Sequence, residues 1–471
     1  MLVFGLCSVR DSAERTTQQP FDAVRPRTMQ KRPRPLAILF ANDPESMALA
    51  PRKSFCSSAL PYNYRVRILI SAGEASGEMY GAQLIEALRR QATDPSRVAG
   101  LSPVLAGQGA VAAQTPKLEF FGAGGQRMRA AGCEIIVDAR DLAVVGITEI
   151  LSHLPKILGL YRKLIRAADQ RRPALAVVID SPAFNWRVAR QMRRRGIPVV
   201  YYVCPQFWAW RQGRVKLLRK YIDKALVIFP FEEKFYRDRG VDAIFVGHPL
   251  ADVPPPAVSR KDYAVEQGLE ATRPWITLMP GSRRKEVRMN LPTMLAAAQR
   301  LGRTGEYEFL LPIAPTLDSS FLRAAITAAR RRTPALPDIH LVREALPALF
   351  HARAAIVASG TATVEAALMG TPFVMVYRVS ALTYALGKPR VKVPHYAMVN
   401  LIAGKEIVPE LVQHRFTVEN VVAEMNRIIP EGQPRSLMIE QLAAVKARLQ
   451  PARNAAHPSE QAAAIILSVL R

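Results

Sequence analysis

The chain has 471 residues, of which 49% are hydrophobic and 22% charged, a globular composition that argues against extensive disorder and, at this length, favours two domains over one core. Lysine and arginine outnumber aspartate and glutamate by 65 to 39, and the net charge is +26. This charge favours an anionic partner: nucleic acid, an anionic lipid surface or a phosphorylated substrate.

Residues 1–63 contain the segment RPRTMQKRPRP, several prolines and little periodicity, so we interpret them as a disordered extension or as the result of a mis-called translation start. Strands and helices alternate in residues 64–249, as is typical of a parallel sheet covered on both faces. An inserted loop is predicted at residues 91–117, which are rich in Ala, Gly, Pro and Ser. The predicted strands of this domain are Val66–Ser71, Leu118–Phe121, Leu175–Asp180, Pro198–Val203 and Ala225–Phe229, and its helices include Tyr80–Arg90 and Trp186–Arg195.

The same alternation is predicted again over residues 250–435, after the VGHPL segment. Its strands are Trp275–Met279, Phe309–Ile313, His340–Val342, Ala354–Val357 and Phe373–Tyr377. A C-terminal helical segment, residues 436–471, is a candidate to pack back on the first domain. These patterns predict an α/β protein with two doubly wound, Rossmann-like domains and a ligand cleft at the carboxyl edges of their strands.

Three segments of the first domain carry candidate site residues. Asp180 lies at the carboxyl end of a buried strand, where its carboxylate could act as a general base or could simply cap the turn before Pro182. The loop ISAGEASGEMYG contains Glu74 and Glu78 but does not match a dinucleotide-binding or P-loop motif, and helix capping is the alternative role. The segment CPQFWAWR offers Gln206 and two tryptophans that could shape the cleft or cover a sugar.

Two turns of the second domain are candidate anion sites. In ASGTATVEAALMGTP, the turn Ser359, Gly360 and Thr361 follows a strand and precedes a helix, whose free N–H groups attract phosphate. Glu365 lies about one turn further on and could accept hydrogen bonds from ribose hydroxyls or merely complement the helix dipole. In LMPGSRRKEV, Gly281 and Ser282 form a turn, and Arg283 could bind a diphosphate through forked hydrogen bonds; a solvated turn is the alternative. Two such turns on neighbouring strands would favour a nucleotide diphosphate.

The sequence does not favour a metal or a disulfide framework. There is no D-x-D pair and no H-E-x-x-H motif, and the four cysteines, Cys7, Cys56, Cys133 and Cys204, are widely scattered. We therefore expect a reduced, cytoplasmic setting without a metal or other cofactor. No apolar run approaches the ~20 residues of a membrane-spanning helix.

Eight motifs together resemble the lipid-A-disaccharide synthases, in the same order and over about residues 64–470: SAGEASGE, GAGGQRM, VVIDSPAFN, CPQFWAWR, VGHPLAD, PGSRRKEV, SGTATVEAALMGTP and NLIAGKEIVPEL. The resemblance implies a glycosyltransferase B-type fold. It implies transfer from UDP-2,3-diacylglucosamine to 2,3-diacylglucosamine 1-phosphate, with inversion, to give a β(1→6) disaccharide and UDP. Asp180 matches the proposed base of the family, Arg283, Glu365 and Asn400 match donor-site positions, and Glu74 matches the first loop. The chain departs from the family at Glu78 and Ala183, where the family often has aspartate, which leaves the acceptor contacts open.

Because both implied substrates carry acyl chains, the resemblance also implies a peripheral protein on the cytoplasmic face of the inner membrane. Residues 147–168 predict an amphipathic helix that either docks on lipid or packs on the core. Its apolar side has Ile150, Leu154, Ile157, Leu158, Tyr161, Leu164 and Ile165, and its basic residues are Lys156, Arg162, Lys163 and Arg166.

Two other functions remain open from the sequence. One is a different UDP-sugar enzyme of the same fold, such as a 2-epimerase or a peptidoglycan glycosyltransferase, which would form a different product. The other is a basic nucleic-acid-binding protein. The charge permits this function, but no helix-turn-helix, zinc finger or RNP-type motif is visible, and binding would have to weaken steeply with salt.

Overall fold

The computed structural model describes residues 65–73, 75–94, 117–142, 147–210, 212–451 and 457–470. All of these residues belong to one compact unit that includes residues 63–471. The predicted extension, residues 1–63, lies outside the described residues, as does most of the predicted insertion at residues 91–117.

The first half of the described chain forms a parallel sheet of seven strands in the order β3-β2-β1-β4-β5-β6-β7. Its central strands are rich in β-branched and aliphatic residues and are buried on both faces, as a sheet covered by helices on each side requires. The strands are β1 Arg65–Ala72, β2 Lys117–Gly124, β3 Cys133–Asp138, β4 Leu175–Ile179, β5 Val199–Tyr202, β6 Lys224–Val227 and β7 Ala243–Phe245.

The helices of this half connect consecutive strands and cover the sheet. They are α1 Ala75–Ala92, α3 Gln126–Ala130, α4 Ala139–Leu142, α5 Ile147–Arg171, α6 Pro182–Arg194, α7 Phe207–Trp210, α8 Val215–Tyr221 and α9 Pro230–Arg237. The chain runs from β1 outward through β2 to β3, and then returns through α5 to β4 on the other side of β1. The strand order therefore reverses between β1 and β4.

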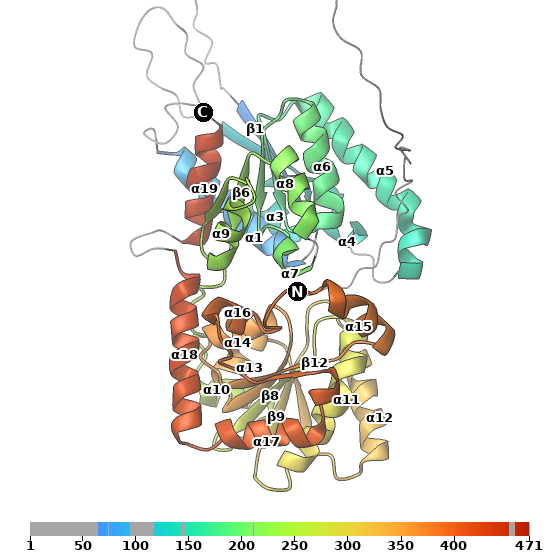
Figure 1. Ribbon diagram of the computed structural model, residues 1–471, viewed down its shortest axis with the longest axis vertical. Helices are drawn as coiled ribbons and strands as arrows, with labels where there is room; N and C mark the ends of the chain where they lie inside the picture. Colours follow the sequence, from blue (N-terminus) through green and yellow to red (C-terminus); the bar gives the residue numbers. More distant parts are fainter. Residues whose placement is uncertain are drawn as a thin grey trace, which may run out of the picture. The chain divides into compact units, whose positions relative to one another are not determined.

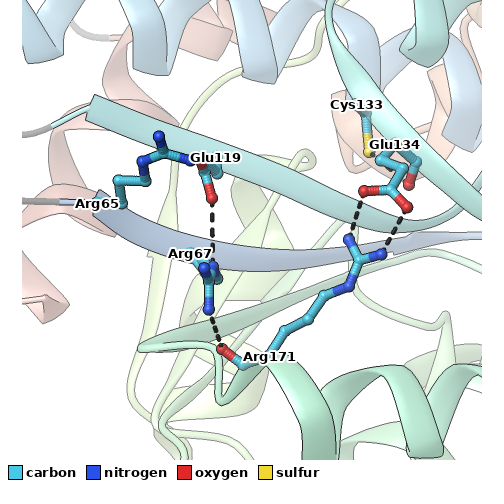
Figure 2. A network of polar contacts seen from close by, with 6 residues as sticks. All are labelled: Arg65, Arg67, Glu119, Cys133, Glu134 and Arg171. Atoms are coloured by element: carbon cyan, nitrogen blue, oxygen red, sulfur yellow. Dashed lines mark hydrogen bonds and ion pairs between the residues drawn. The ribbon is translucent and has the colours of Figure 1, made fainter.

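A network of ion pairs joins the end of α5 to the first residues of the sheet (Figure 2). Arg171 donates two hydrogen bonds to the carboxylate of Glu134, both of 2.5 Å, and its carbonyl accepts one from Arg67 at 3.3 Å. Glu119 accepts from both Arg65 and Arg67, at 2.8 and 3.2 Å. These residues lie at the amino edge of the sheet, so the network contributes to holding α5 in place and not to a site at the carboxyl edge.

The second half forms a parallel sheet of six strands in the order β10-β9-β8-β11-β12-β13. The strand order reverses between β8 and β11, as it does between β1 and β4 in the first sheet. The strands of the second sheet are β8 Trp275–Met279, β9 Glu308–Pro312, β10 Ile339–Val342, β11 Ala354–Ala358, β12 Phe373–Tyr377 and β13 Glu410–Val412. Its helices are α10 Arg260–Gln267, α11 Arg284–Leu301, α12 Ser319–Arg332, α13 Ala345–Phe350, α14 Ala362–Leu368, α15 Ala381–Gly387, α16 Met398–Ala403 and α17 Val418–Ile428.

The two C-terminal helices pack on different halves of the chain. Helix α18, Gln433–Leu449, contacts α14 and α16 of the second half, whereas α19, Pro458–Val469, contacts α1 of the first (Figure 1). Two side chains of α1 hold Glu460 of α19: Arg90 at 2.8 Å and Gln91 at 2.6 Å. The part of the predicted C-terminal segment that lies against the first half is therefore α19.

The predicted α/β class with two doubly wound, Rossmann-like domains is confirmed by the two sheets. The predicted strands agree with observed strands to within three residues at each end, whereas β3, β7 and β13 have no predicted counterpart. The three strands that were missed lie at the edges of the two sheets, where partial exposure weakens the apolar pattern. The domain boundaries at residues 249 and 435 remain predictions.

Candidate functional site

The loops after β1, β4 and β5 begin at the same edge of the first sheet. Ala72 pairs with Ile179, and Ile179 pairs with Tyr202, so the three strands end at one level. Asp180, directly after β4, therefore lies beside the point where the strand order reverses. In open parallel sheets such a reversal leaves a crevice at the carboxyl edge, which is where ligands bind.

Asp180 has an unusual backbone conformation and a perturbed carboxyl group. Its φ is +46° and that of Ser181 is +45°, both in the left-handed region that non-glycine residues rarely adopt. The side chain is half-buried, and burial raises the pKa of the carboxyl above its ordinary value. The N–H of Ser181 and the positive charge of Arg283 act in the opposite direction and lower the pKa. A carboxyl with a raised pKa is a better proton acceptor once it is ionised.

The remaining candidates of the first domain have different surroundings. Glu74 lies outside the described residues. Glu78 accepts a hydrogen bond from the N–H of Arg127 at 2.7 Å, so its carboxylate caps the start of α3. Gln206 is half-buried in the segment after β5. Trp208 is only 4% exposed and donates its indole N–H to the buried carboxylate of Glu232 at 2.8 Å, so the prediction that Trp208 could cover a sugar is wrong.

In the second sheet the two predicted anion-binding turns are neighbours. β8 and β11 pair directly, with Met279 opposite Val357, and their strand order reverses between them. The turns at residues 280–283 and 359–361 therefore start side by side at the carboxyl edge, at the reversal point. This relationship, which could not be read from either turn alone, makes a common ligand possible.

The first turn is held by Glu286 and Asn290 of α11. The carboxylate of Glu286 accepts from the N–H groups of Ser282 and Arg283, at 3.1 and 3.3 Å. Gly281 has a φ of +117°, and a side chain there would meet Glu286 within 2.7 Å. Asn290, fully buried, donates to the carbonyl of Pro280 at 3.0 Å. These contacts fix the direction in which the backbone leads to Arg283.

The Arg283 guanidinium is only loosely engaged within the described protein. Its nearest carboxylate oxygen, on Glu286, is 4.0 Å away, and 31% of the Arg283 side chain is exposed. The next residue differs: Arg284 forms a 2.6 Å ion pair with Asp318 and lies over the ring of Phe321. Of these two adjacent arginines, Arg283 is the one whose hydrogen-bond donors remain available for an anion.

The second turn presents backbone donors and a carboxylate. The Ser359 hydroxyl donates to the carbonyl of Tyr396 at 2.9 Å. The backbone N–H groups of Gly360 and Thr361 donate no hydrogen bond to any residue in the part of the chain that the structure describes. The half-buried Glu365 carboxylate likewise has no hydrogen-bond partner among the described residues, and burial raises its pKa. Donors for an anion and an acceptor for hydroxyls thus lie within one turn of chain.

Asn400 is placed differently from the other donor-site candidates. Its side chain is fully buried, and its amide donates to the carbonyl of Val408 and to Glu410, at 2.9 and 2.8 Å. Its oxygen accepts from the N–H groups of Ile407 and Val408, at 2.8 and 3.0 Å. All four hydrogen-bonding positions of the amide are therefore used inside the protein, so in this structure Asn400 supports the loop around it, and its role as a donor-site residue stays a prediction.

Comparison with known proteins identifies the family. A sequence model described as lipid-A-disaccharide synthetase matches residues 68–466. The lipid-A-disaccharide synthase of Koribacter versatilis is 50% identical over 404 residues, which cover 86% of this chain and 98% of that protein. The chain belongs to the lipid-A-disaccharide synthase family. The family's synthase from Acidobacterium capsulatum is 48% identical, over 81% of this chain and 91% of its own length.

Solved structures agree with a glycosyltransferase B-type fold for this family member. A UDP-GlcNAc 2-epimerase from Neisseria meningitidis, bound to UDP-GlcNAc, has a TM-score of 0.53 at 11% identity, over 86% of this chain and 99% of that one. The glycosyltransferase of kitacinnamycin has a TM-score of 0.55 at 13% identity, over 87% and 100% of the two chains. At these identities the likeness concerns the fold alone.

Two observations bear on metals and membranes in this synthase-family chain. Within the described ranges, no group of three or more His, Cys, Asp and Glu side chains is placed to hold a metal ion. Among the same residues, no helix is long and apolar enough to cross a membrane.

The predicted amphipathic helix is α5, and its C-terminal half belongs to the core. Leu164 is fully buried, and Ile157, Tyr161 and Ile165 pack partly buried against the same core, so for this half the core-packing alternative holds. Leu158 is different, because 41% of it is exposed. The side chains of Ile150 and Leu154 lie outside the described part.

Several residues that shape the site are not among those predicted from the sequence. Asn290 and Glu286 hold the turn before Arg283, and Asn185 and Tyr201 contact the backbone of Asp180. Asn185 and Glu286 lie within the motifs VVIDSPAFN and PGSRRKEV, whereas for Asn290 and Tyr201 a polar group within an apolar pattern is the available clue.

Proposed function

We propose that this protein transfers the 2,3-diacylglucosaminyl group of UDP-2,3-diacylglucosamine to the 6-hydroxyl of 2,3-diacylglucosamine 1-phosphate, forming the β(1→6) disaccharide 1-phosphate and UDP. The observation that carries the proposal is the pair of turns at the reversal point of the second sheet, in a chain of the lipid-A-disaccharide synthase family. The names of the relatives give only the synthesis of a lipid A disaccharide, and the donor, acceptor and linkage are part of this proposal.

The transfer is a single displacement that inverts the anomeric carbon. The acceptor O6 forms a bond to C1 of the donor as the bond from C1 to the β-phosphate oxygen breaks. The proton of O6 passes to the carboxylate of Asp180, and the bonding electron pair leaves with UDP. A positioned base contributes typically about 10²–10⁴-fold to such a step, and the raised pKa of Asp180 is consistent with this role.

The second domain would hold the UDP. Arg283 and the backbone N–H groups of Gly281, Gly360 and Thr361 would surround the diphosphate, with Ser282 and Ser359 lining the same turns. Forked guanidinium bonds and oriented amides there stabilise the charge that develops on the leaving group. The unpartnered carboxylate of Glu365 would accept hydrogen bonds from the ribose. No metal and no other cofactor enters this scheme. Gln206, in the segment after β5, and Glu74, which lies outside the described residues, would contact the acceptor.

The acylated substrates place the reaction at a membrane surface. We infer a cytoplasmic protein that binds peripherally to the inner membrane, with the exposed Leu158 and the exposed basic side chains of α5, among them Arg162, Lys163 and Arg166, facing lipid. The high net charge of the chain supports attraction to anionic headgroups.

The decisive experiment is product identification. Purified protein is incubated in EDTA with the two proposed substrates, and the products are identified by mass spectrometry. Disaccharide 1-phosphate and UDP in equal amounts are expected. An epimerised UDP-sugar in place of the disaccharide would instead assign another activity of the same fold.

A further inference from the structure

Two consecutive residues after β4 adopt a conformation that their side chains do not favour. Asp180 and Ser181 both have a φ near +45°, and Ser181 is followed by Pro182, which further restricts it. Neither residue is glycine, so contacts with the rest of the fold must impose the conformation. The structure contains these contacts, and they converge on the backbone of Asp180.

Asn185, in the first turns of α6, makes the first set of contacts with the backbone around Asp180. Its amide nitrogen lies within hydrogen-bonding distance of three carbonyl oxygens: Ile179 at 2.8 Å, Asp180 at 2.9 Å and Ser71 at 3.1 Å. Its oxygen accepts from the Ser71 hydroxyl at 2.7 Å. Asn185 and Ser71 are both fully buried. The side chain thus ties the end of β4 to the end of β1.

Tyr201, on β5, makes the second set of contacts with the backbone of Asp180. Its hydroxyl donates to the carbonyl of Asp180 at 2.7 Å, and its ring is fully buried. The N–H of Asp180 donates in turn to the carbonyl of Tyr202 at 3.2 Å. The carbonyl of Asp180 therefore has donors from both α6 and β5, and the peptide that follows it is held in one orientation.

Close packing adds a third restraint. A side chain on Gly73 would meet the Ser181 hydroxyl at 2.4 Å, so Ser181 occupies the space that any other residue at 73 would need. The turn is thus confined from the β1 side as well as from α6 and β5.

We propose that Asn185 and Tyr201 are positioning residues, which hold Asp180 in its left-handed conformation and so aim its carboxylate at the reacting hydroxyl. The orientation of the peptides on either side of Asp180 sets the direction of its Cα–Cβ bond, so a peptide held in one orientation also fixes the direction in which the side chain leaves the backbone. Small errors in such a direction are costly, because a base must lie within hydrogen-bonding reach of its proton. This inference rests on the proposed function of Asp180.

Tyr201→Phe is the variant that tests the inference, and Tyr202→Phe is its matched control. Both residues are fully buried neighbours on β5, and both substitutions remove one hydroxyl. The Tyr202 hydroxyl, however, has no hydrogen-bond partner among the described residues. Tyr201→Phe should lower kcat about 5- to 10-fold, the effect of one lost hydrogen bond, without changing the affinity for UDP. Tyr202→Phe should leave kcat within about 2-fold of wild type.

Combining Tyr201→Phe with Asp180→Asn distinguishes a role of Tyr201 in positioning the Asp180 carboxylate from a role in the fold alone. If Tyr201 acts through the carboxylate, its loss should change the residual turnover of Asp180→Asn by less than about 2-fold. The inference is overturned if Tyr201→Phe and Tyr202→Phe have equal kcat, or if the full effect of Tyr201→Phe persists without the carboxylate. Near-normal turnover of Asp180→Asn alone is a different outcome, which removes the proposed base itself.

A stronger variant is Asn185→Asp, which keeps the shape of the side chain but replaces its donor with an acceptor. We expect about a 100-fold lower kcat with unchanged affinity for UDP, because all three backbone carbonyls lose this donor. A folded Asn185→Asp protein with wild-type kcat would overturn the role of Asn185, and if this variant does not fold, the Tyr201 comparison decides.

Discussion

The side-chain amide of Asn400 donates a hydrogen bond of 2.8 Å to the carboxylate of Glu410, and both groups are buried. The same carboxylate accepts from the N–H of Tyr396 at 2.9 Å, and the carbonyl of Tyr396 accepts from the hydroxyl of Ser359. A short chain of bonds thus links Asn400 to the turn at residues 359–361.

This link predicts an indirect effect for Asn400→Ala. Removing the amide leaves the buried N–H groups of Ile407 and Val408 without this acceptor and takes one of several donors from Glu410, so we expect a loss of about 2–3 kcal/mol in the free energy of unfolding. UDP affinity should fall only a few-fold, because the turn is loosened and no ligand contact is lost. Denaturant unfolding and calorimetric titration with UDP measure the two effects. A large loss of affinity with wild-type stability would show that Asn400 contacts the donor directly.

Arg283→Ala tests the anion site. We expect UDP affinity in EDTA to fall about 10- to 100-fold, since a hydrogen bond to a charged group contributes about 1.5–3 kcal/mol. Arg284→Ala is the control, because it removes the same charge one residue away, where the guanidinium is already paired with Asp318. Equal losses of affinity in the two variants would indicate a general charge effect and would remove Arg283 from the donor site.

Asp180→Asn tests the base. The amide keeps the shape of the side chain but cannot accept the proton, so kcat should fall about 10²–10⁴-fold while UDP affinity and the folded state stay near wild type. Retention of near-normal turnover, with chemistry shown to be rate-limiting, would make Asp180 a structural cap and Glu74 the next carboxylate to test.

The pH profile of the wild-type protein gives an independent measurement. The base must be ionised to act, and burial raises the pKa of Asp180. Activity should therefore be lost as the pH falls through a value above the ordinary aspartate pKa of about 3.9. We expect the acidic limb of kcat/KM at that raised value, and an acidic limb at or below pH 3.9 would contradict the shift.

Two leucines of helix α5 allow its proposed contact with lipid and its packing on the core to be tested independently. Leu158→Ser should weaken association with anionic liposomes without changing stability, because the side chain is 41% exposed. Leu164→Ser should instead lower the free energy of unfolding by about 2–5 kcal/mol, since that side chain is fully buried. Sedimentation with liposomes and thermal unfolding measure the two outcomes. Unchanged liposome binding of Leu158→Ser would remove Leu158 from the membrane contact.

The sequence alone determined the repeated alternation of strands and helices, and with it the α/β class, the two domains and the residues that follow each strand. It could do so because the apolar periodicity of a strand or helix is local, and because Asp180 and the turn that leads to Arg283 follow strand patterns that are themselves clear. The order of motifs also sufficed to indicate the family.

Only the tertiary structure decided which strands are neighbours and which polar groups are already used. The adjacency of Met279 and Val357 joins segments nearly 80 residues apart, and the bond between Ser71 and Asn185 spans 114 residues. No local pattern records such pairings, because they depend on how whole strands and helices pack. For the same reason Asn400, which looks like a ligand-binding residue in its motif, has its amide saturated inside the fold, whereas the Glu365 carboxylate remains without a partner among the described residues.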